Sequence, residues 1–325
     1  MVVVIKAPWS AVEEAARELE RRLGLRPERG GLLAAHTTMR VGGPADLLIE
    51  VKDRFTLRGV VRLAQGRGWP LLLLGRGSNL IVGDGGFRGI VLLNRSRTVT
   101  HGADGVTLTF DSGVPMAKAA TIAAEAGLTG LEFALAIPGN IGGAIWANAG
   151  AHGAEIATVL TFASLLHADG SESEVPTSAL QFAYRESRFK SAAGAGEVIL
   201  GGTFKLTSEE PAVIRERLEE IRRWRREHQP LGIPSAGSIF RNPPTGPSAG
   251  ALIEAAGLKG FRIGAAEVST MHANWILNRG GATAADVRAL HDAGVPPEDE
   301  RARALAGRWM ALLVRDTNND PRMLA

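Results

Sequence analysis

Glycine is concentrated in three parts of this chain, where it predicts loops of unusual backbone geometry. Forty of the 325 residues are glycine, and they gather at Gly42-Gly43, from Gly75 to Gly86 and from Gly139 to Gly153. Without a Cβ atom, glycine accepts positive φ angles and lets backbone N–H groups come close to a ligand. A single cluster is equally well explained as a tight turn. Three clusters, each beside an apolar segment, favour loops that hold a phosphate or pyrophosphate.

The common phosphate-binding motifs are absent from the sequence. No glycine is followed directly by lysine, as a P-loop requires, and no GxGxxG opens a helix after a strand. Kinase-like and Rossmann interpretations therefore both weaken. The segment Gly246 to Gly250 (GPSAG) matches a hydrolase nucleophile motif, but Pro243 and Pro244 deny it the preceding strand that the motif needs.

The chain contains no cysteine. This excludes disulfides, thiolate zinc sites, iron–sulfur clusters and a cysteine nucleophile. The seven histidines have no metal-binding spacing, so we predict no metal site. Redox chemistry in such a chain requires a bound cofactor.

Composition and charge favour a globular protein with a small-molecule ligand. The formal net charge of +3 is small and suits an anionic small molecule, and the basic run Arg222 to Arg226 is explained as the solvated face of a helix. No apolar run approaches the roughly 18 to 20 residues that span a bilayer, and the N-terminus lacks a signal-peptide core. We therefore expect a cytoplasmic monomer with neither nucleic-acid nor membrane partners.

Hydrophobic periodicity predicts an α/β unit at the start of the chain. Residues Ala11 to Leu23 have helical spacing, with Ser10 as the N-cap and Gly24 at the stop. Apolar runs follow at Ala45 to Val51 and Leu71 to Val82, with a helical stretch from Phe55 to Gly66 between them.

The rest of the chain divides into two further units. β-rich segments at Gly89 to Leu93, Val106 to Phe110, Val159 to Leu166 and Val198 to Leu206 accompany a helix at Pro115 to Ala126. A helical stretch from Glu209 to Gln229 then precedes a proline-rich segment. We predict three domains: 1–96 with the N-terminal helix, 97–210, and 211–325.

The segments LGRGSNLIVGDGGF (74–87), YRESRFK (184–190) and SAGSIFRNP (235–243) occur in this order along the chain. Together with several others, they resemble the UDP-N-acetylenolpyruvoylglucosamine reductase (UDP-N-acetylmuramate dehydrogenase) family. Those similar to its flavin-binding half are TTMRVGGPAD (37–46), LGRGSNLIVGDGGF (74–87), GLTGLEFALAIPGNIGGAIWANAGAHG (127–153) and YRESRFK (184–190). Those similar to its substrate-binding domain are PLGIPSAGSIFRNP (230–243), AGALIEAAGLKG (249–260) and VSTMHANWILN (268–278). The segments run in the family's order over about residues 35 to 290, and the HANW segment resembles the shorter, type II form.

The resemblance implies an α+β protein: an FAD-binding fold of the vanillyl-alcohol-oxidase (PCMH) type with two α+β subdomains, 1–96 and 97–210, followed by a C-terminal α+β substrate-binding domain. FAD is the implied cofactor and NADPH the implied reductant. The implied cofactor-binding residues are Val41, Gly42, Gly43, Pro44, Ala45, Gly75, Arg76, Gly77, Ser78, Asn79, Pro138, Gly139, Asn140, Gly142, Gly143 and Ala144. Backbone N–H groups of these loops would bind the pyrophosphate oxygens.

The resemblance also implies a reaction. NADPH reduces the flavin, and a hydride then passes from flavin nitrogen 5 to carbon 3 of the enolpyruvyl ether of UDP-N-acetylglucosamine. Arg185 matches the arginine that stabilises the resulting negative charge. Ser238 matches the serine that protonates carbon 2. Outside the motif, a serine beside Gly237 is more simply a turn cap.

Substrate binding is implied for Tyr184, Arg241, Asn242 and Lys259, the lysine acting as a point charge for the diphosphate. Tyr184 is also consistent with a half-buried aromatic that has a structural role. His272 and Asn274 are interpreted as structural.

The end of the chain departs from the family pattern. The family's final segment, similar to LEPEVRxxG, supplies a catalytic glutamate, and no such segment occurs here. The nearest candidates, Glu298 and Glu300, stand about ten residues early. Either the tail is divergent or an altered reading frame has replaced it; we favour the second because the family-like pattern stops near Ala293.

Two other functions remain open from the sequence. Another FAD oxidoreductase of the same fold would share the glycine loops but would not explain SAGSIFRNP (235–243). A flavin-binding or nucleotide-sugar-binding protein that no longer catalyses would explain the missing glutamate.

Overall fold

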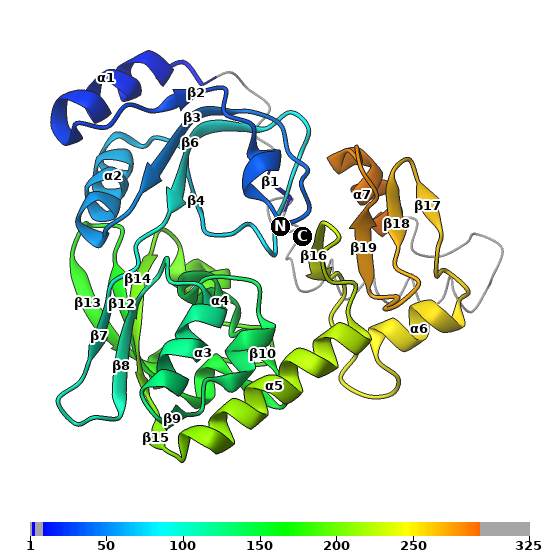
Figure 1. The fold of residues 1–325 in the computed structure, drawn as a ribbon. Helices are drawn as coiled ribbons and strands as arrows, with labels where there is room; N and C mark the ends of the chain where they lie inside the picture. The colour runs from blue at the N-terminus through cyan, green and yellow to red at the C-terminus, as the bar shows by residue number, and fades with distance from the viewer. Residues whose placement is uncertain (1, 4–8, 293–325) are drawn as a thin grey trace.

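The computed structural model describes residues 2–3 and 9–292, which form three units of mixed helices and sheets (Figure 1). Each unit is built on its own sheet and has its own buried apolar cluster. None of the described helices combines the length and apolar character that crossing a bilayer requires.

The first unit has a four-stranded sheet in the order β2-β3-β6-β4. Its strands are β2 (Glu28–Arg29), β3 (Ala45–Val51), β4 (Leu71–Leu74) and β6 (Phe87–Asn94), and β3 and β4 both run parallel to β6. Side chains alternate between the faces of a strand. In β3, Leu47 and Ile49 face the cluster formed with α1 (Val12–Leu23) and α2 (Arg54–Arg67), whereas Leu48 packs on the opposite side.

The starts of these two helices differ. Asp53 caps α2, because its carboxylate accepts the backbone N–H of Thr56 at 2.7 Å. The prediction that Ser10 caps α1 is wrong: Ala11 occupies the N-cap and no side chain accepts a hydrogen bond there. Ser10 stands one residue too early. The predicted stop is confirmed, since Gly24 adopts a left-handed φ of 66°.

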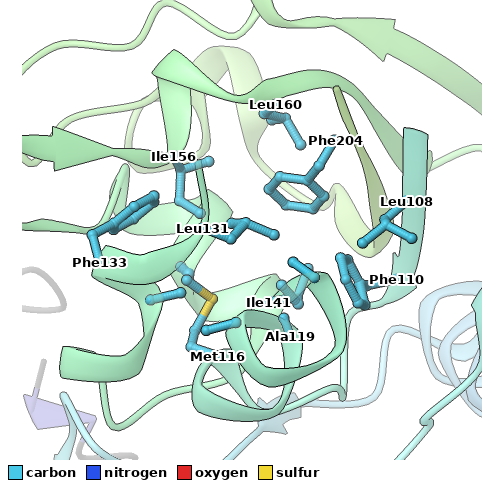
Figure 2. Packing of buried hydrophobic residues seen from close by; sticks show 14 of the residues in the cluster. Leu108, Phe110, Met116, Ala119, Leu131, Phe133, Ile141, Ile156, Leu160 and Phe204 are labelled. Carbon is cyan, nitrogen blue, oxygen red and sulfur yellow. The ribbon is translucent and has the colours of Figure 1, made fainter. Parts of the chain in front are cut away.

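The second unit has a five-stranded antiparallel sheet in the order β13-β12-β14-β8-β7. Its strands are β7 (Val99–His101), β8 (Thr107–Asp111), β12 (Leu160–Leu166), β13 (Glu172–Pro176) and β14 (Val198–Lys205). Figure 2 shows its core, which includes Phe110 and Phe204. Their rings pack edge to face, with 5.7 Å between the ring centroids. Helices α3 (Met116–Glu125), α4 (Ile141–Ala147) and α5 (Pro211–His228) contribute buried residues to this core.

The long helix α5 begins at the predicted boundary, residue 211, and was assigned by the prediction to the third unit. Its buried residues Ile214, Leu218 and Ile221 all belong to the core of the second unit. We therefore infer that the second unit extends through α5 and that the third begins after His228. The division at residue 97 stays a prediction.

The third unit has an antiparallel sheet in the order β16-β19-β18-β17. Its elements are β16 (Ser235–Ser238), α6 (Ala249–Ala255), β17 (Arg262–Ile263), β18 (Ala266–Val268), β19 (Trp275–Asn278) and α7 (Ala284–Asp292). Met39 and Val41, from the first unit, complete its apolar cluster.

Short elements connect these larger ones. The paired strands are β1 (Val2–Val3) with β5 (Ile81–Val82), β9 (Leu128–Thr129) with β15 (Thr207–Ser208), and β10 (Gly150–Ala151) with β11 (Ala154–Glu155). The 3-10 turns are η1 (Leu33–His36), η2 (Glu132–Ala136), η3 (Ile156–Thr158), η4 (Thr177–Ala179), η5 (Arg188–Lys190) and η6 (Ala192–Gly194).

Hydrogen bonds fix the third unit against the first. The Asp84 carboxylate accepts the N–H groups of Ala284 at 2.8 Å and Ala285 at 3.0 Å, at the start of α7. The Asn278 side chain donates to the Met39 carbonyl at 3.0 Å. Asp84 therefore serves as an N-terminal acceptor for a helix that lies about 200 residues further along the chain.

Replacing Asp84 tests this connection. Asp84→Ala removes the only described side-chain acceptor for the Ala284 and Ala285 amides and should lower the free energy of unfolding by about 1 kcal/mol. Asp84→Asn should retain most of the stability, because asparagine is an equally good acceptor at this position. Urea unfolding followed by tryptophan fluorescence measures both. An Ala variant as stable as the unmodified protein would contradict the role.

Candidate functional site

The three glycine-bearing segments meet in the structure. The Thr38 N–H donates to the Gly77 carbonyl at 3.2 Å, which joins segment 37–43 to segment 75–79. A Cβ atom added at Gly139 would lie 3.3 Å from the Ser78 hydroxyl oxygen, and one added at Gly75 would lie 3.0 Å from the Asn140 side-chain oxygen. Three loops that are distant in the sequence therefore lie next to one another in the folded protein.

The loop 75–79 has backbone N–H groups that donate no hydrogen bond to the residues that the structure describes. In the described part of the chain, no hydrogen bond is donated by the amides of Gly77, Ser78 or Asn79. Gly77 has a φ of 60°, and a Cβ there would lie 2.6 Å from the His36 carbonyl oxygen, so only glycine fits. Successive amides without an acceptor are suited to binding an anion.

Positive charge stands beside the same loop. The Arg95 Nη1 donates to the Gly75 carbonyl at 2.6 Å. Burial lowers the pKa of Arg95; Glu50 opposes this shift, and the neighbouring Arg97 and Arg76 lower the pKa further. Arginines gathered this closely repel one another, so a bound anion would relieve them.

Asn140, at the start of α4, carries a buried acceptor without a donor. It is 5% exposed, its side-chain nitrogen donates to the Gly113 carbonyl, and its Oδ1 has no hydrogen-bond partner among the described residues. Buried polar atoms of proteins are normally paired. A ligand hydroxyl or N–H group would satisfy this oxygen.

The glycines of α4 differ in their surroundings. A Cβ at Gly143 would meet nothing within 4 Å, so space is open there. Gly142 is instead a packing residue: its N–H donates to the Ser112 carbonyl at 2.9 Å, and a Cβ would lie 2.8 Å from that of Ser112. Unused amides, a positive field, an unpaired acceptor and open space together fit a dinucleotide such as FAD.

The segment Val41–Ala45 is largely engaged with the protein itself. The Gly43 N–H donates to the Gly83 carbonyl at 3.0 Å, and the Ala45 N–H donates to the Gly31 carbonyl at 2.9 Å. A Cβ at Gly43 would lie 2.0 Å from the Asp84 carbonyl oxygen. The structure gives this segment a packing role, and its predicted contact with the cofactor stays a prediction.

Arg185 lies on a tight turn that is clamped to the C-terminal end of α4. The Ser187 hydroxyl donates to the Trp146 carbonyl at 2.5 Å, and the Asn148 side chain donates to the Ala183 carbonyl at 2.9 Å. The Arg185 Nη2 donates to the Gly150 carbonyl at 2.6 Å. Arg185 has a φ of 57°, which is uncommon for a residue other than glycine.

Tyr184 is exposed beside this turn. Its exposed fraction is 54%, and the Arg185 guanidinium lies 5.7 Å from the centroid of its ring. About half of this residue's surface is therefore covered, and its predicted role in substrate binding stays a prediction. Its ring is available to a ligand.

Ser238 ends strand β16 with its side chain exposed. The pairing register shifts between Ser235 and Ser238, and Gly237 has a φ of 80°. The Ser238 hydroxyl makes no hydrogen bond in the described part of the chain, so the turn-cap alternative is not supported.

Asn274 holds the segment that follows Ser238. Its side chain donates to the Phe240 carbonyl at 2.8 Å and accepts the Phe240 N–H at 2.9 Å. This matches the structural interpretation of Asn274. The strand end that carries Ser238 is therefore fixed from the neighbouring strand.

An ion pair connects the two segments that carry the predicted catalytic residues. The Arg241 guanidinium pairs with the Glu186 carboxylate, and both side chains are substantially exposed. This pair joins the turn of Arg185 to the segment of Ser238. Because exposed ion pairs contribute at most about 1 kcal/mol, Arg241 can exchange Glu186 for an anionic ligand.

Two other predicted substrate-binding residues are linked to α6. The Asn242 Oδ1 accepts the Ala249 N–H at 3.0 Å, and the Lys259 Nζ pairs with Glu254 at 2.5 Å. Within the described residues, neither side chain is hydrogen-bonded or ion-paired to Arg185 or Ser238, so their roles stay predictions. Glu298 and Glu300 lie outside the described residues.

Sequence reasoning missed two members of the Arg185 turn, Glu186 and Lys190. The Lys190 Nζ donates to the Arg185 carbonyl at 2.5 Å. Both residues belong to YRESRFK (184–190), and their pairing depends on how the turn folds. The motif indicated that this segment belongs to the site, but the contacts among its residues could not be predicted from the sequence.

Comparison with known proteins accounts for both halves of the chain. A family model described as an FAD binding domain matches residues 44–175, and one described as the C-terminal domain of UDP-N-acetylenolpyruvoylglucosamine reductase matches residues 229–293. The first match confirms the predicted FAD-binding fold of the vanillyl-alcohol-oxidase type. The second ends where the sequence departs from the family pattern.

Individual relatives agree. The chain is 42% identical to the UDP-N-acetylenolpyruvoylglucosamine reductase of Halalkalibacterium halodurans over 259 residues, which are 79% of this chain and 84% of that protein. It is 42% identical to reductase 2 of Symbiobacterium thermophilum over 283 residues, which are 87% of this chain and 90% of that protein.

A solved structure is also similar. The crystal structure of the reductase from Thermus caldophilus has a TM-score of 0.72 and 36% sequence identity, and the match covers 83% of this chain and 94% of that one. The predicted resemblance is thus confirmed over most of both chains. On this evidence the chain belongs to the UDP-N-acetylenolpyruvoylglucosamine reductase family.

Proposed function

We propose that this chain uses FAD and NADPH to reduce the enolpyruvyl ether of UDP-N-acetylglucosamine to UDP-N-acetylmuramate, a step of peptidoglycan precursor synthesis. Membership of the reductase family and the FAD-binding domain support an FAD-dependent oxidoreductase. The observation that carries the assignment to residues is the Glu186–Arg241 ion pair, because it joins the segments of Arg185 and Ser238.

The cofactor would be held where the glycine loops meet. The amides of 77–79 and the charge of Arg95 suit a pyrophosphate, and the unpaired Asn140 oxygen suits a hydroxyl. When bound and reduced by NADPH, FAD supplies the hydride that adds to carbon 3 of the enolpyruvyl group. We keep the wider predicted set, 41–45, 75–79 and 138–144, as the proposed cofactor-binding residues.

Arg185 would stabilise the charge that builds on the substrate carboxylate. One terminal nitrogen of its guanidinium is bound to the Gly150 carbonyl, which fixes the direction of the side chain. In the described chain the Nε and Nη1 groups have no partner. These N–H groups can donate hydrogen bonds to a carboxylate whose charge increases in the transition state.

Ser238 would deliver a proton to carbon 2. A serine hydroxyl is a weak acid, but the acceptor is a strongly basic enolate carbon, so reach matters more than acidity. The exposed and unengaged hydroxyl at the end of β16 supports this role. The glutamate that assists in the family has its nearest candidates, Glu298 and Glu300, beyond the described residues.

Tyr184, Arg241, Asn242 and Lys259 would bind the nucleotide sugar. The ion pairs of Arg241 and Lys259 involve partly exposed side chains. A diphosphate offers more negative charge than one carboxylate, so it can displace Glu186 or Glu254.

The ligand class is a small-molecule UDP-sugar. The finer expectations are a cytoplasmic monomer that binds neither membrane nor nucleic acid, and these remain proposals that rest on composition and charge.

Filling the open space at Gly143 tests the cofactor site. Gly143→Ala adds a methyl group that meets no protein atom within 4 Å. It should therefore leave folding of the apoprotein intact and weaken FAD binding about tenfold or more. Gly66→Ala in α2 is the matched control, because it is also a helical glycine with nothing within 4 Å. Equal FAD affinity of the two variants, measured by flavin fluorescence titration, would argue against the site.

Ser238→Ala tests the proton donor. Under anaerobic conditions, reduction of the yellow protein by NADPH should be nearly unchanged, because this half-reaction needs no proton from Ser238. Reoxidation by UDP-N-acetylglucosamine enolpyruvate should slow by about 100- to 10,000-fold. Stopped-flow absorbance follows both steps.

Ser248→Ala is the control for this experiment, because Ser248 caps α6 and has no proposed chemistry. Equal damage to both half-reactions in Ser238→Ala would contradict the assignment. An unmodified protein that NADPH bleaches but this substrate cannot recolour would favour a flavoprotein of another activity.

A further inference from the structure

Lys190 has surroundings that an ordinary surface lysine lacks. It ends η5, directly after the turn that carries Arg185. Its Nζ donates to the Arg185 carbonyl at 2.5 Å and lies 4.7 Å from the ring centroid of Trp146. The ammonium is thus placed between the backbone of the predicted catalytic arginine and an aromatic ring of α4.

The hydrogen bond from Lys190 is made to a residue with an uncommon backbone conformation. Arg185 has a φ of 57°, a conformation that a residue with a side chain rarely adopts and that its surroundings must maintain. The turn is closed by the Glu186 N–H, which donates to the Ala183 carbonyl at 2.9 Å. Lys190 adds a charged donor on the carbonyl of Arg185 itself, and charged donors form stronger hydrogen bonds than neutral ones.

The direction of the Arg185 guanidinium depends on this backbone. Its Nη2 reaches the Gly150 carbonyl at 2.6 Å, from a main chain held by Lys190 on one side and by the Ser187–Trp146 hydrogen bond on the other. A change in the φ and ψ angles of Arg185 that released this carbonyl would also change the direction of its side chain relative to Gly150. Lys190 itself does not need to touch a substrate to affect the chemistry.

We propose that Lys190 is a positioning residue for the second half-reaction, in which its ammonium holds the Arg185 backbone so that the guanidinium faces the substrate carboxylate. This inference rests on the proposed function, in particular on the role of Arg185. It assigns a task to a residue whose side chain has no proposed contact with cofactor or substrate.

The protonation of Lys190 gives the proposal a pH dependence. The pKa of Lys190 is lowered to about 8. Burial is the largest cause, Arg241 and Arg185 also lower the pKa, and Glu186 raises it. These three side chains are the charged groups that face the ammonium from the adjoining segments. Below about pH 8 the ammonium is present. Above it the donor is a neutral amine, whose hydrogen bond is about half as strong.

The test compares Lys190→Met and Lys190→Arg with the unmodified holoenzyme. Methionine keeps an apolar stem over Trp146 and removes the donor, whereas arginine keeps a donor that stays protonated, since its pKa is above about 12. Anaerobic stopped-flow measures both half-reactions from about pH 6 to about pH 10, a range that brackets the pKa of about 8.

In the unmodified enzyme, reoxidation by the enolpyruvyl substrate should slow as pH rises through about 8, while flavin reduction by NADPH does not follow this limb. Below that pH, the reoxidation rate of Lys190→Met should be at least about tenfold lower than that of the unmodified enzyme. Its rate should also no longer fall as the pH rises through about 8. Lys190→Arg should recover much of the rate and move the limb to higher pH. A methionine variant with the unmodified rate and limb, or with both half-reactions slowed equally, would overturn the proposal.

A crystal structure of Lys190→Met provides a readout that does not depend on the substrate. In it, Arg185 should leave the left-handed φ region or release the Gly150 carbonyl. An unchanged Arg185 would overturn the positioning role even if the reductase activity is confirmed. Conversely, if the unmodified protein fails to reduce the enolpyruvyl substrate but Arg185 moves in the variant, the proposed function fails and the positioning contact stands.

Discussion

The architecture depends on chain crossings at which no side chain can stand. A Cβ at Gly86 would lie 1.8 Å from the Pro44 carbonyl oxygen, and one at Gly43 would lie 2.0 Å from the Asp84 carbonyl oxygen. These contacts bring segment 41–45 against segment 83–87, and a Cβ at Gly77 would lie 2.6 Å from the His36 carbonyl oxygen. These direct backbone contacts act together with the buried apolar cluster that includes Leu33, Val82 and Phe87 to hold the loops in place. The third unit then docks on this assembly through Asp84 and Asn278.

Local patterns predicted the elements whose signals are local. The strand at Ala45–Val51 was predicted with its observed bounds, because a short, mainly apolar segment flanked by glycine-bearing loops is typical of a strand. The cap at Ser10 was wrong by one residue, since capping depends on local angles that the sequence does not specify. The short helix α4 was not predicted, because its glycines disguise it as a loop.

In the candidate site, too, some features could be predicted from the sequence and others could not. The resemblance named Arg185 and Ser238, and the structure places them on segments that the Glu186–Arg241 ion pair joins. The partners of charged side chains could not be predicted, because ion pairing is decided by tertiary proximity. Lys190 illustrates this: in the sequence it is one more lysine after an aromatic residue, and only the folded turn brings it to the Arg185 carbonyl.

Helix α4 connects the two parts of the chemistry. At its first turn, Asn140 and Gly143 border the space proposed for the cofactor. At its last turn, the carbonyl of Trp146 and the side chain of Asn148 hold the turn that carries Arg185. Seven helical residues span only about 10 Å at a rise of about 1.5 Å each. A helix this short bends little, so it fixes the arginine relative to the bound dinucleotide. Ser238 belongs to a separate unit, which Asp84 and Asn278 fix against the first unit and which the Glu186–Arg241 ion pair joins to the turn of Arg185.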